Sequence, residues 1–130
     1  KDLAQWTPLY AYTFTYPDAA FILPERRKLG AFHAAELQFV FHGPMGWFQR
    51  SFSGDELALT NAMMDYWSQF AHTGNPNKEG LQVWPLFSDE QKQIMLDRQI
   101  SVSNTFKQEN CAFWRDLNIG GRQMLAHFEK

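Results

Sequence analysis

The sequence has one cysteine, few basic residues and no long apolar run, and each shortage excludes a class of protein. Because Cys111 is the single cysteine among 130 residues, no disulfide can form within the chain and no cysteine-based zinc site can be built. We expect Cys111 to be a buried thiol, with a bridge to a cysteine outside this chain as the alternative.

Lysine and arginine together number 12 against 14 acidic residues, and the densest basic run, residues 25–28, is too short to follow a nucleic acid backbone. We therefore expect no nucleic acid partner. No stretch approaches the roughly 18 to 20 continuous apolar residues that cross a bilayer, so we expect no membrane span. The first residues lack a signal-peptide pattern, which leaves the compartment open.

Several catalytic and cofactor motifs are missing as well. The chain has no G-x-S-x-G nucleophile elbow, no Walker loop and no dinucleotide fingerprint. None of its four histidines has the spacing of H-E-x-x-H or a comparable metal motif, so we expect no metal site and no cofactor. The histidines are His33, His42, His72 and His127.

Aromatic residues, in contrast, are abundant at 16% of the chain, with twelve Phe and five Trp. Burying all of them would need a large core for a chain of this length. Either this is a tightly packed small domain, or some rings cover a partner surface or a further part of the protein.

Residues 10–16 have the pattern of a β-strand, because aromatic side chains recur at every second position with alanine and threonine between them. Both faces are fairly apolar, which favours an interior strand with cover on each side. Pro17 and Asp18 end the strand. A long connection over residues 17–32 then leads to His33, and connections of this length are usually functional.

The spacing of apolar residues predicts a helix from about Gly54 to about Thr73. Ser53 and Glu56 have the form of a capping box at its start, and Gly74 followed by Pro76 ends it. Its apolar stripe indicates core packing rather than a ligand pocket. The stripe consists of Leu59, Met63, Tyr66, Trp67 and Phe70.

The remaining pattern predicts a loop over 74–92, a short strand over 93–96, a helix over about 105–117 and a final helix over 122–128. Together with a short helix after His33, this gives an α/β segment that is mostly helical, with one or two strands. Such a segment has too few strands for a covered sheet of its own. The helix over 105–117 is expected to bury Phe106, Cys111, Phe113 and Trp114.

His33 is the strongest candidate for chemistry, because it follows a long loop that follows an apolar strand. In open α/β sheets, functional groups collect at the carboxyl ends of strands, and imidazole exchanges protons near neutral pH. On position alone, a structural histidine is still the better interpretation.

Five segments together change that balance. The run from Leu29 to Phe41, "LGAFHAAELQFVF", resembles the histidine motif of the type B carboxylesterase and cholinesterase family. "LYAYTFTY" is similar to the strand before that motif, and "LTNAMMDYWSQFAHTGNPN", "VWPLF" and "CAFWRDL" resemble later segments of the family in the same order. The resemblance covers about residues 9 to 117.

The resemblance implies that residues 1–130 are one segment, the C-terminal portion of an α/β-hydrolase catalytic domain. In that fold the triad histidine comes last, after a serine and an Asp or Glu. The resemblance therefore makes His33 the catalytic histidine and the parent protein a serine esterase acting on small carboxylic esters, with this chain inactive by itself.

The same resemblance gives Glu36 a supporting role in the polar network behind the active site; the alternative is a carboxylate favoured by the dipole of a short helix. It places Cys111 where secreted relatives pair with an upstream cysteine. His42 stands where the family proceeds directly to glycine, and we assign it no role.

A second hypothesis is a non-catalytic interaction domain derived from the same family. Retention of His33 and Glu36 argues against it, since binding alone would not need them. Under the first hypothesis we expect the isolated fragment to self-associate through its first strand, because the chain lacks strands to cover it.

Overall fold

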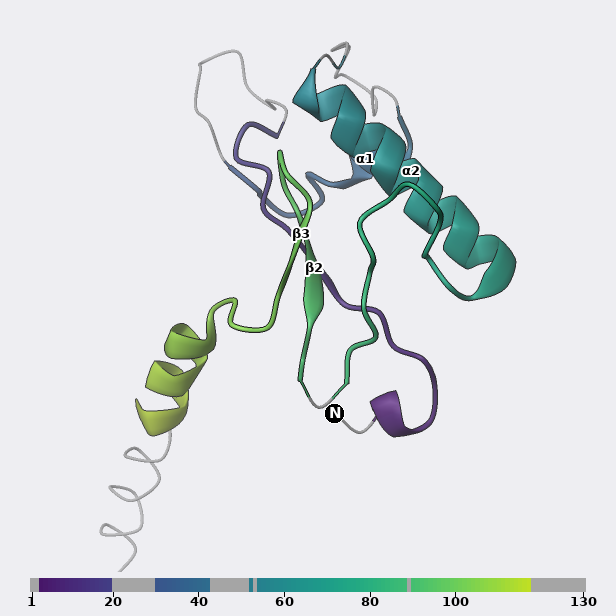
Figure 1. Cartoon of the computed structure of the whole chain (residues 1–130). Helices are drawn as coiled ribbons and strands as arrows, with labels where there is room; N and C mark the ends of the chain where they lie inside the picture. Colours follow the sequence, from purple (N-terminus) through teal and green to yellow (C-terminus); the bar gives the residue numbers. More distant parts are fainter. Residues whose placement is uncertain (1–2, 20–29, 43–51, 53, 89, 118–130) are drawn as a thin grey trace, which may run out of the picture.

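The computed structural model describes residues 3–19, 30–42, 52, 54–88 and 90–117. Its elements follow in the order η1 (Leu3–Gln5), β1 (Tyr12–Phe14), α1 (Leu37–Val40), α2 (Asp55–Thr73), β2 (Gln93–Leu96) and β3 (Ser101–Ser103). A further helix covers residues 108–117 (Figure 1). The predicted final helix over 122–128, like His127 and the glycines and proline of 43–46, lies outside the described residues.

The three strands form one sheet in the order β1-β2-β3. β1 pairs with β2 in parallel, with Tyr12 opposite Ile94, and β2 pairs with β3 in antiparallel orientation. Parallel neighbours need a crossover connection, and here α1 and α2 lie within it, which makes the segment an α/β unit. The predicted α/β class and both predicted strands are confirmed.

Two features of the sheet differ from expectation. The sheet has a third strand, Ser101–Ser103, where one or two strands were predicted. A single valine between two serines shows too little alternation of apolar and polar residues to be recognised as a strand. In the described part of the chain β1 lies at an edge with β2 as its one strand neighbour, so the expected interior position is not met here. A second neighbour would have to come from another polypeptide segment.

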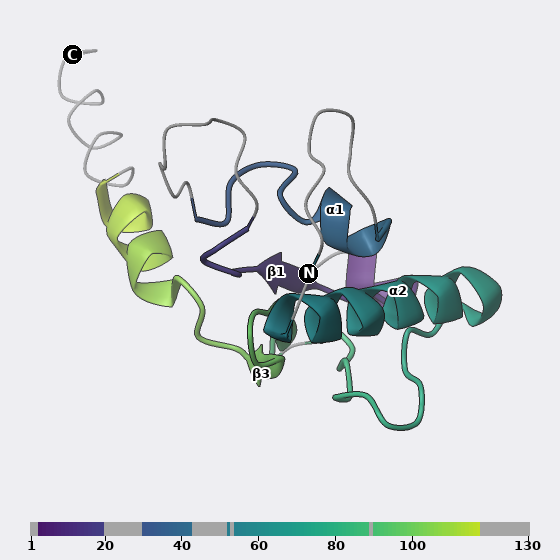
Figure 2. The ribbon, with the colours of Figure 1, turned by 90° about the horizontal axis from the view of Figure 1, so that it is seen from above.

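The two faces of β1 have different surroundings. The aromatic face packs against the helices: Tyr12 lies edge-on to Trp67 at 5.2 Å between ring centroids, and Phe14 lies 5.2 Å from Phe39. Figure 2 shows β1 running beside α2. On the other face Thr13 donates a 3.0 Å hydrogen bond to the Gln93 side chain, which fixes the strand pair laterally.

The core lies between the sheet and α2. Of the predicted stripe, Leu59, Met63 and Tyr66 are buried, which confirms core packing, whereas Trp67 is half-buried and Phe70 is exposed. Further large buried side chains come from the residues after β1, from α1, from the loop after α2 and from β2: Tyr16, Phe39, Trp84, Ile94 and Leu96.

The predicted helix 54–73 is confirmed as α2, but its start differs from the predicted capping box. The N-cap is Gly54 at φ 55°, without a side-chain cap, while Ser53 lies outside the described residues. At the other end Gly74 is left-handed at φ 73° and its N–H donates to the Phe70 carbonyl at 2.8 Å, as predicted.

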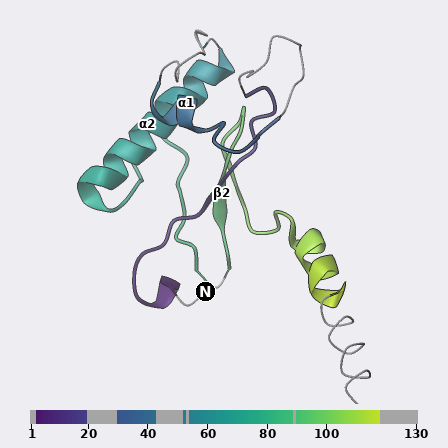
Figure 3. The ribbon, with the colours of Figure 1, turned by 180° about the vertical axis from the view of Figure 1, so that it is seen from behind.

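The helix of residues 108–117 extends away from the rest of the molecule, which Figures 1 and 3 show from opposite sides. Phe106 is partly buried, but Phe113 and Trp114 are 58% and 67% exposed and Cys111 is an exposed free thiol. The predicted burial of Cys111, Phe113 and Trp114 is therefore wrong for this chain. The reason is that the helix projects from the sheet and α2, so that these side chains do not reach the core.

Among the described residues, no group of three or more His, Cys, Asp or Glu is placed to hold a metal ion. Within the same ranges, no helix is long and apolar enough to cross a membrane.

Candidate active site

His33 is exposed on a turn that leads directly into α1. The turn begins at Gly30 with φ 64°, and the Phe32 N–H donates to the Gly30 carbonyl at 3.0 Å. Ala34, the residue after His33, is also left-handed at φ 65°. For a residue with a Cβ this conformation costs on the order of 1 to 2 kcal/mol, and such strain is concentrated at functional sites.

The residues after His33 are firmly packed. Ala35 and Phe39 are buried, and the Phe39 ring lies 4.9 Å from Phe52 in a stacked arrangement and 5.4 Å from Tyr16. His33 is thus an exposed imidazole on a strained turn whose continuation is held in the core. An exposed, well-anchored histidine can exchange a proton with a partner brought to it.

Glu36 is half-buried at the N-cap position of α1 and makes no side-chain cap hydrogen bond. Because α1 has only four residues, a dipole effect on this carboxylate is small. Burial, and then the negative charge of Glu36, raise the pKa of Tyr12. Among the described residues no hydrogen bond or ion pair joins Glu36 to His33.

Glu36 and Tyr12 also line a cavity of about 430 Å³ between β1, α1 and α2. His33 is not among the residues that line it. The other lining residues are mostly apolar: Leu37, Val40, Phe41, Met64, Trp67, Ser68 and Ala71. Glu36, the last residue of the turn that carries His33, therefore lies near the first strand and α2.

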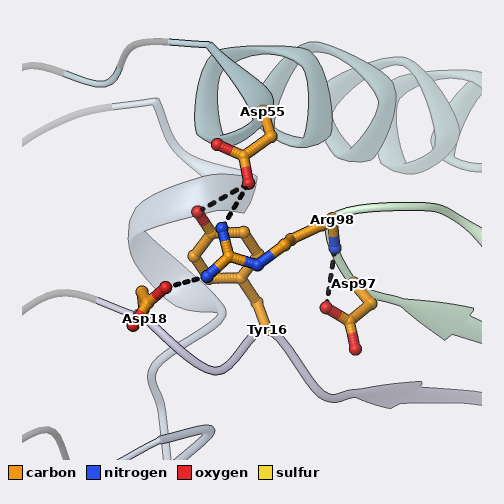
Figure 4. A network of polar contacts seen from close by, with 5 residues as sticks. All are labelled: Tyr16, Asp18, Asp55, Asp97 and Arg98. Atoms are coloured by element: carbon orange, nitrogen blue, oxygen red, sulfur yellow. Dashed lines mark hydrogen bonds and ion pairs between the residues drawn. The ribbon is translucent and has the colours of Figure 1, made fainter.

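A polar network joins the ends of β1 and β2 to the start of α2 (Figure 4). Arg98 follows β2, and its guanidinium donates one bond to Asp55 Oδ2 at 2.8 Å and forms an ion pair with Asp18. The guanidinium carbon also lies 5.2 Å from the centre of the Tyr16 ring. The Tyr16 hydroxyl donates to the same Asp55 oxygen at 3.2 Å, so that Arg98, Asp55 and Tyr16 each contact the other two.

A model of the carboxylesterase family matches residues 1–114 of the chain. The chain belongs to this family. The carboxylesterase chain is 38% identical over 110 residues to human cocaine esterase and 36% identical over 107 residues to mouse acylcarnitine hydrolase. These matches cover 83% and 82% of the chain.

The carboxylesterase chain spans about a fifth of the length of these relatives, 19% of each. Among solved structures it is similar to a PNB esterase, with 27% identity and a TM-score of 0.64 over 84% of the chain and 21% of that structure. The fold is accordingly that of part of an α/β-hydrolase.

Sequence reasoning singled out His33 and Glu36, whose roles stay predictions, and it missed the Arg98 network. The ion pair between Arg98 and Asp18 joins residues 80 positions apart, and the bond to Asp55 joins residues 43 apart. No local motif marks such a set, because its members meet only when β1 and β2 pair. The one available signal was the presence of a charged pair, Asp97 and Arg98, immediately after a buried strand.

Proposed function

We propose that residues 1–130 are the C-terminal part of the catalytic domain of a carboxylic ester hydrolase, and that His33 is its general base and acid. Membership of the carboxylesterase family supports the reaction class. The observation that carries the role of His33 is its exposed position on a strained turn anchored by Ala35 and Phe39.

In this proposal His33 takes the proton from a serine hydroxyl as the hydroxyl oxygen attacks the ester carbonyl carbon. The imidazolium then gives that proton to the departing alkoxide, which leaves as an alcohol, and the acyl group stays on the serine. The same imidazole then takes a proton from a water molecule as the water oxygen attacks the acyl carbon. The imidazolium returns that proton to the serine oxygen as the carboxylic acid leaves.

The serine and the acidic member of the triad are proposed to lie in a polypeptide segment upstream of this sequence, because the sequence has no G-x-S-x-G motif. We therefore propose that this chain is inactive by itself. No cofactor is required, since acyl transfer through serine needs only proton transfer and an oxyanion hole. Small carboxylic esters are the proposed substrates.

Glu36 is proposed to support the site rather than to take part in the chemistry. The half-buried residue ends the turn that carries His33, and its negative charge contributes, after burial, to the raised pKa of Tyr12. From there it can fix the electrostatic environment of the turn without touching a substrate.

The decisive experiment compares His33→Ala with His42→Ala in the full-length protein, using p-nitrophenyl esters. His42 is a matched control, because it is also exposed and stands only nine positions later, stacked on Phe52 at 6.5 Å. We expect His33→Ala to lower kcat by at least about a thousandfold, as loss of a triad base does, and His42→Ala to leave kcat unchanged.

Turnover that survives His33→Ala would rule out the proposed role. If the full-length protein hydrolyses none of the esters tried, that result supports the hypothesis of a non-catalytic interaction domain instead.

A further inference from the structure

We propose that Arg98 is a positioning residue that holds the turn carrying His33 in its working orientation. This inference rests on the proposed function of His33 and concerns a residue that touches neither the substrate nor the reacting atoms.

Arg98 connects three segments: the residues after β1, the start of α2 and the residues after β2. Its guanidinium binds Asp18, just after β1, and Asp55, the first residue of α2, and it lies over the ring of Tyr16. Asp97 keeps the backbone at Arg98 in place, because its Oδ1 accepts the Arg98 N–H at 2.7 Å. The Arg98 residue is thus held both at its backbone and at its guanidinium group, as Figure 4 shows.

Tyr16 transmits this arrangement to the segment of His33. The Tyr16 ring is buried and lies 5.4 Å from the ring of Phe39, which is itself buried within α1. The turn of residues 33–36 leads directly into α1, so a shift of Phe39 must move the turn as well. The path from guanidinium to imidazole therefore runs through two packed rings and one short helix.

Arginine suits this role better than lysine would. Its planar fork can bind two carboxylates at once while its flat face covers an aromatic ring, whereas an ammonium group is a compact point charge. Without the guanidinium, the carboxylates of Asp18 and Asp55 lose the cation that lies between them. The link that the guanidinium makes between the residues after β1 and the start of α2 is then lost.

The test measures kcat, KM and the melting temperature of Arg98→Met, Arg98→Lys and Lys78→Met in the full-length protein. Lys78 is a matched control, because its side chain is 49% exposed, as is that of Arg98, and it pairs with Asp65 on α2 at 2.6 Å. Both substitutions to methionine therefore remove one exposed cation from an ion pair with the same helix.

We expect Arg98→Met to lower kcat about tenfold with KM changed less than about twofold, since small displacements of a catalytic group reduce turnover more than binding. Arg98→Lys should recover only part of that loss, and Lys78→Met should have no effect on kcat. In a His33→Ala background, Arg98→Met should cause no further loss of residual turnover, because both changes act through the same imidazole.

Unchanged kcat per folded molecule in Arg98→Met would overturn the inference, and so would an equal loss with and without His33. A His33→Ala variant that keeps full turnover would instead refute the proposed function, whatever Arg98→Met does. The two failures are therefore distinguishable.

Discussion

The indole Nε1–H of Trp84 donates a 3.0 Å hydrogen bond to the backbone carbonyl of Ala11, 73 residues earlier in the chain. The same carbonyl accepts the N–H of Ile94 from β2 at 3.0 Å. Trp84 is buried, and its ring lies edge-on to Tyr66 of α2 at 5.3 Å. One side chain therefore joins β1, α2 and the loop that follows α2.

We predict that Trp84→Phe destabilises the full-length protein by about 1 to 3 kcal/mol, because it removes this hydrogen bond and leaves space beside Tyr66. Denaturant unfolding measures the change. Trp6→Phe is the matched control, since Trp6 is 86% exposed and its replacement should alter stability by less than about 0.5 kcal/mol. Equal effects of the two substitutions would contradict the position assigned to Trp84.

Tyr66 predicts a loss of stability at alkaline pH. Burial raises the pKa of Tyr66 to about 12 from 10.0, and its hydroxyl donates a 2.5 Å hydrogen bond to the Gln82 carbonyl. Between these two pH values the unfolded state releases this proton while the folded state keeps it. The contribution of Tyr66 to stability is therefore complete below pH 10 and decreases as the pH rises toward 12.

Tyr66→Phe should remove this alkaline decrease, and at neutral pH it should cost about 1 kcal/mol for the lost hydrogen bond. Unfolding curves of both proteins across the alkaline range provide the measurement. An identical slope in Tyr66→Phe would mean that another group causes the decrease.

Glu36→Gln is expected to lower the pKa of Tyr12, because it removes a negative charge that opposes formation of the phenolate. The effect should be incomplete, since burial is the larger cause of the raised value and is unchanged by this substitution. Phenolate absorbance during titration reports the shift, with Tyr12→Phe identifying the band. As a supporting residue, Glu36 should also affect kcat less than His33 does; a loss as large as that of His33→Ala would place it in the chemistry.

The isolated chain is predicted to self-associate through β1, whose outer edge has no strand neighbour among the described residues. Sedimentation of the purified chain tests this. Tyr12→Pro should reduce association, because Ala11 and Thr15 on either side bond to β2 and the Tyr12 N–H therefore faces the outer edge, whereas Thr7→Pro, outside the strand, should not. A concentration-independent monomer would contradict the prediction.

The sequence was informative wherever a pattern repeats within one segment. Alternating aromatics identified β1, and the apolar stripe with its terminal Gly74 identified α2. Such patterns show that a side chain needs cover, but not which segment provides it. Phe113, Trp114 and Cys111 are residues of types that are often buried, and they are exposed because helix 108–117 projects from the sheet and α2.

For the candidate site, too, the sequence showed contiguous motifs but not contacts between distant residues. The motif around His33 could be recognised from contiguous residues, while Arg98 depends on partners at positions 18 and 55 that only the fold assembles. The strain at Ala34 could not be predicted either, because alanine carries no preference for left-handed geometry.

The parallel pairing of β1 with β2 also governs the order in which this chain acquires structure. Thr15 and Asp97, whose side chains bond at 2.8 Å across the two strands, are separated by 82 positions. During synthesis β1 therefore leaves the ribosome long before its neighbour exists, and closing so large a loop makes this contact late and slow. Until residue 96 has emerged, β1 lacks the strand that pairs with it.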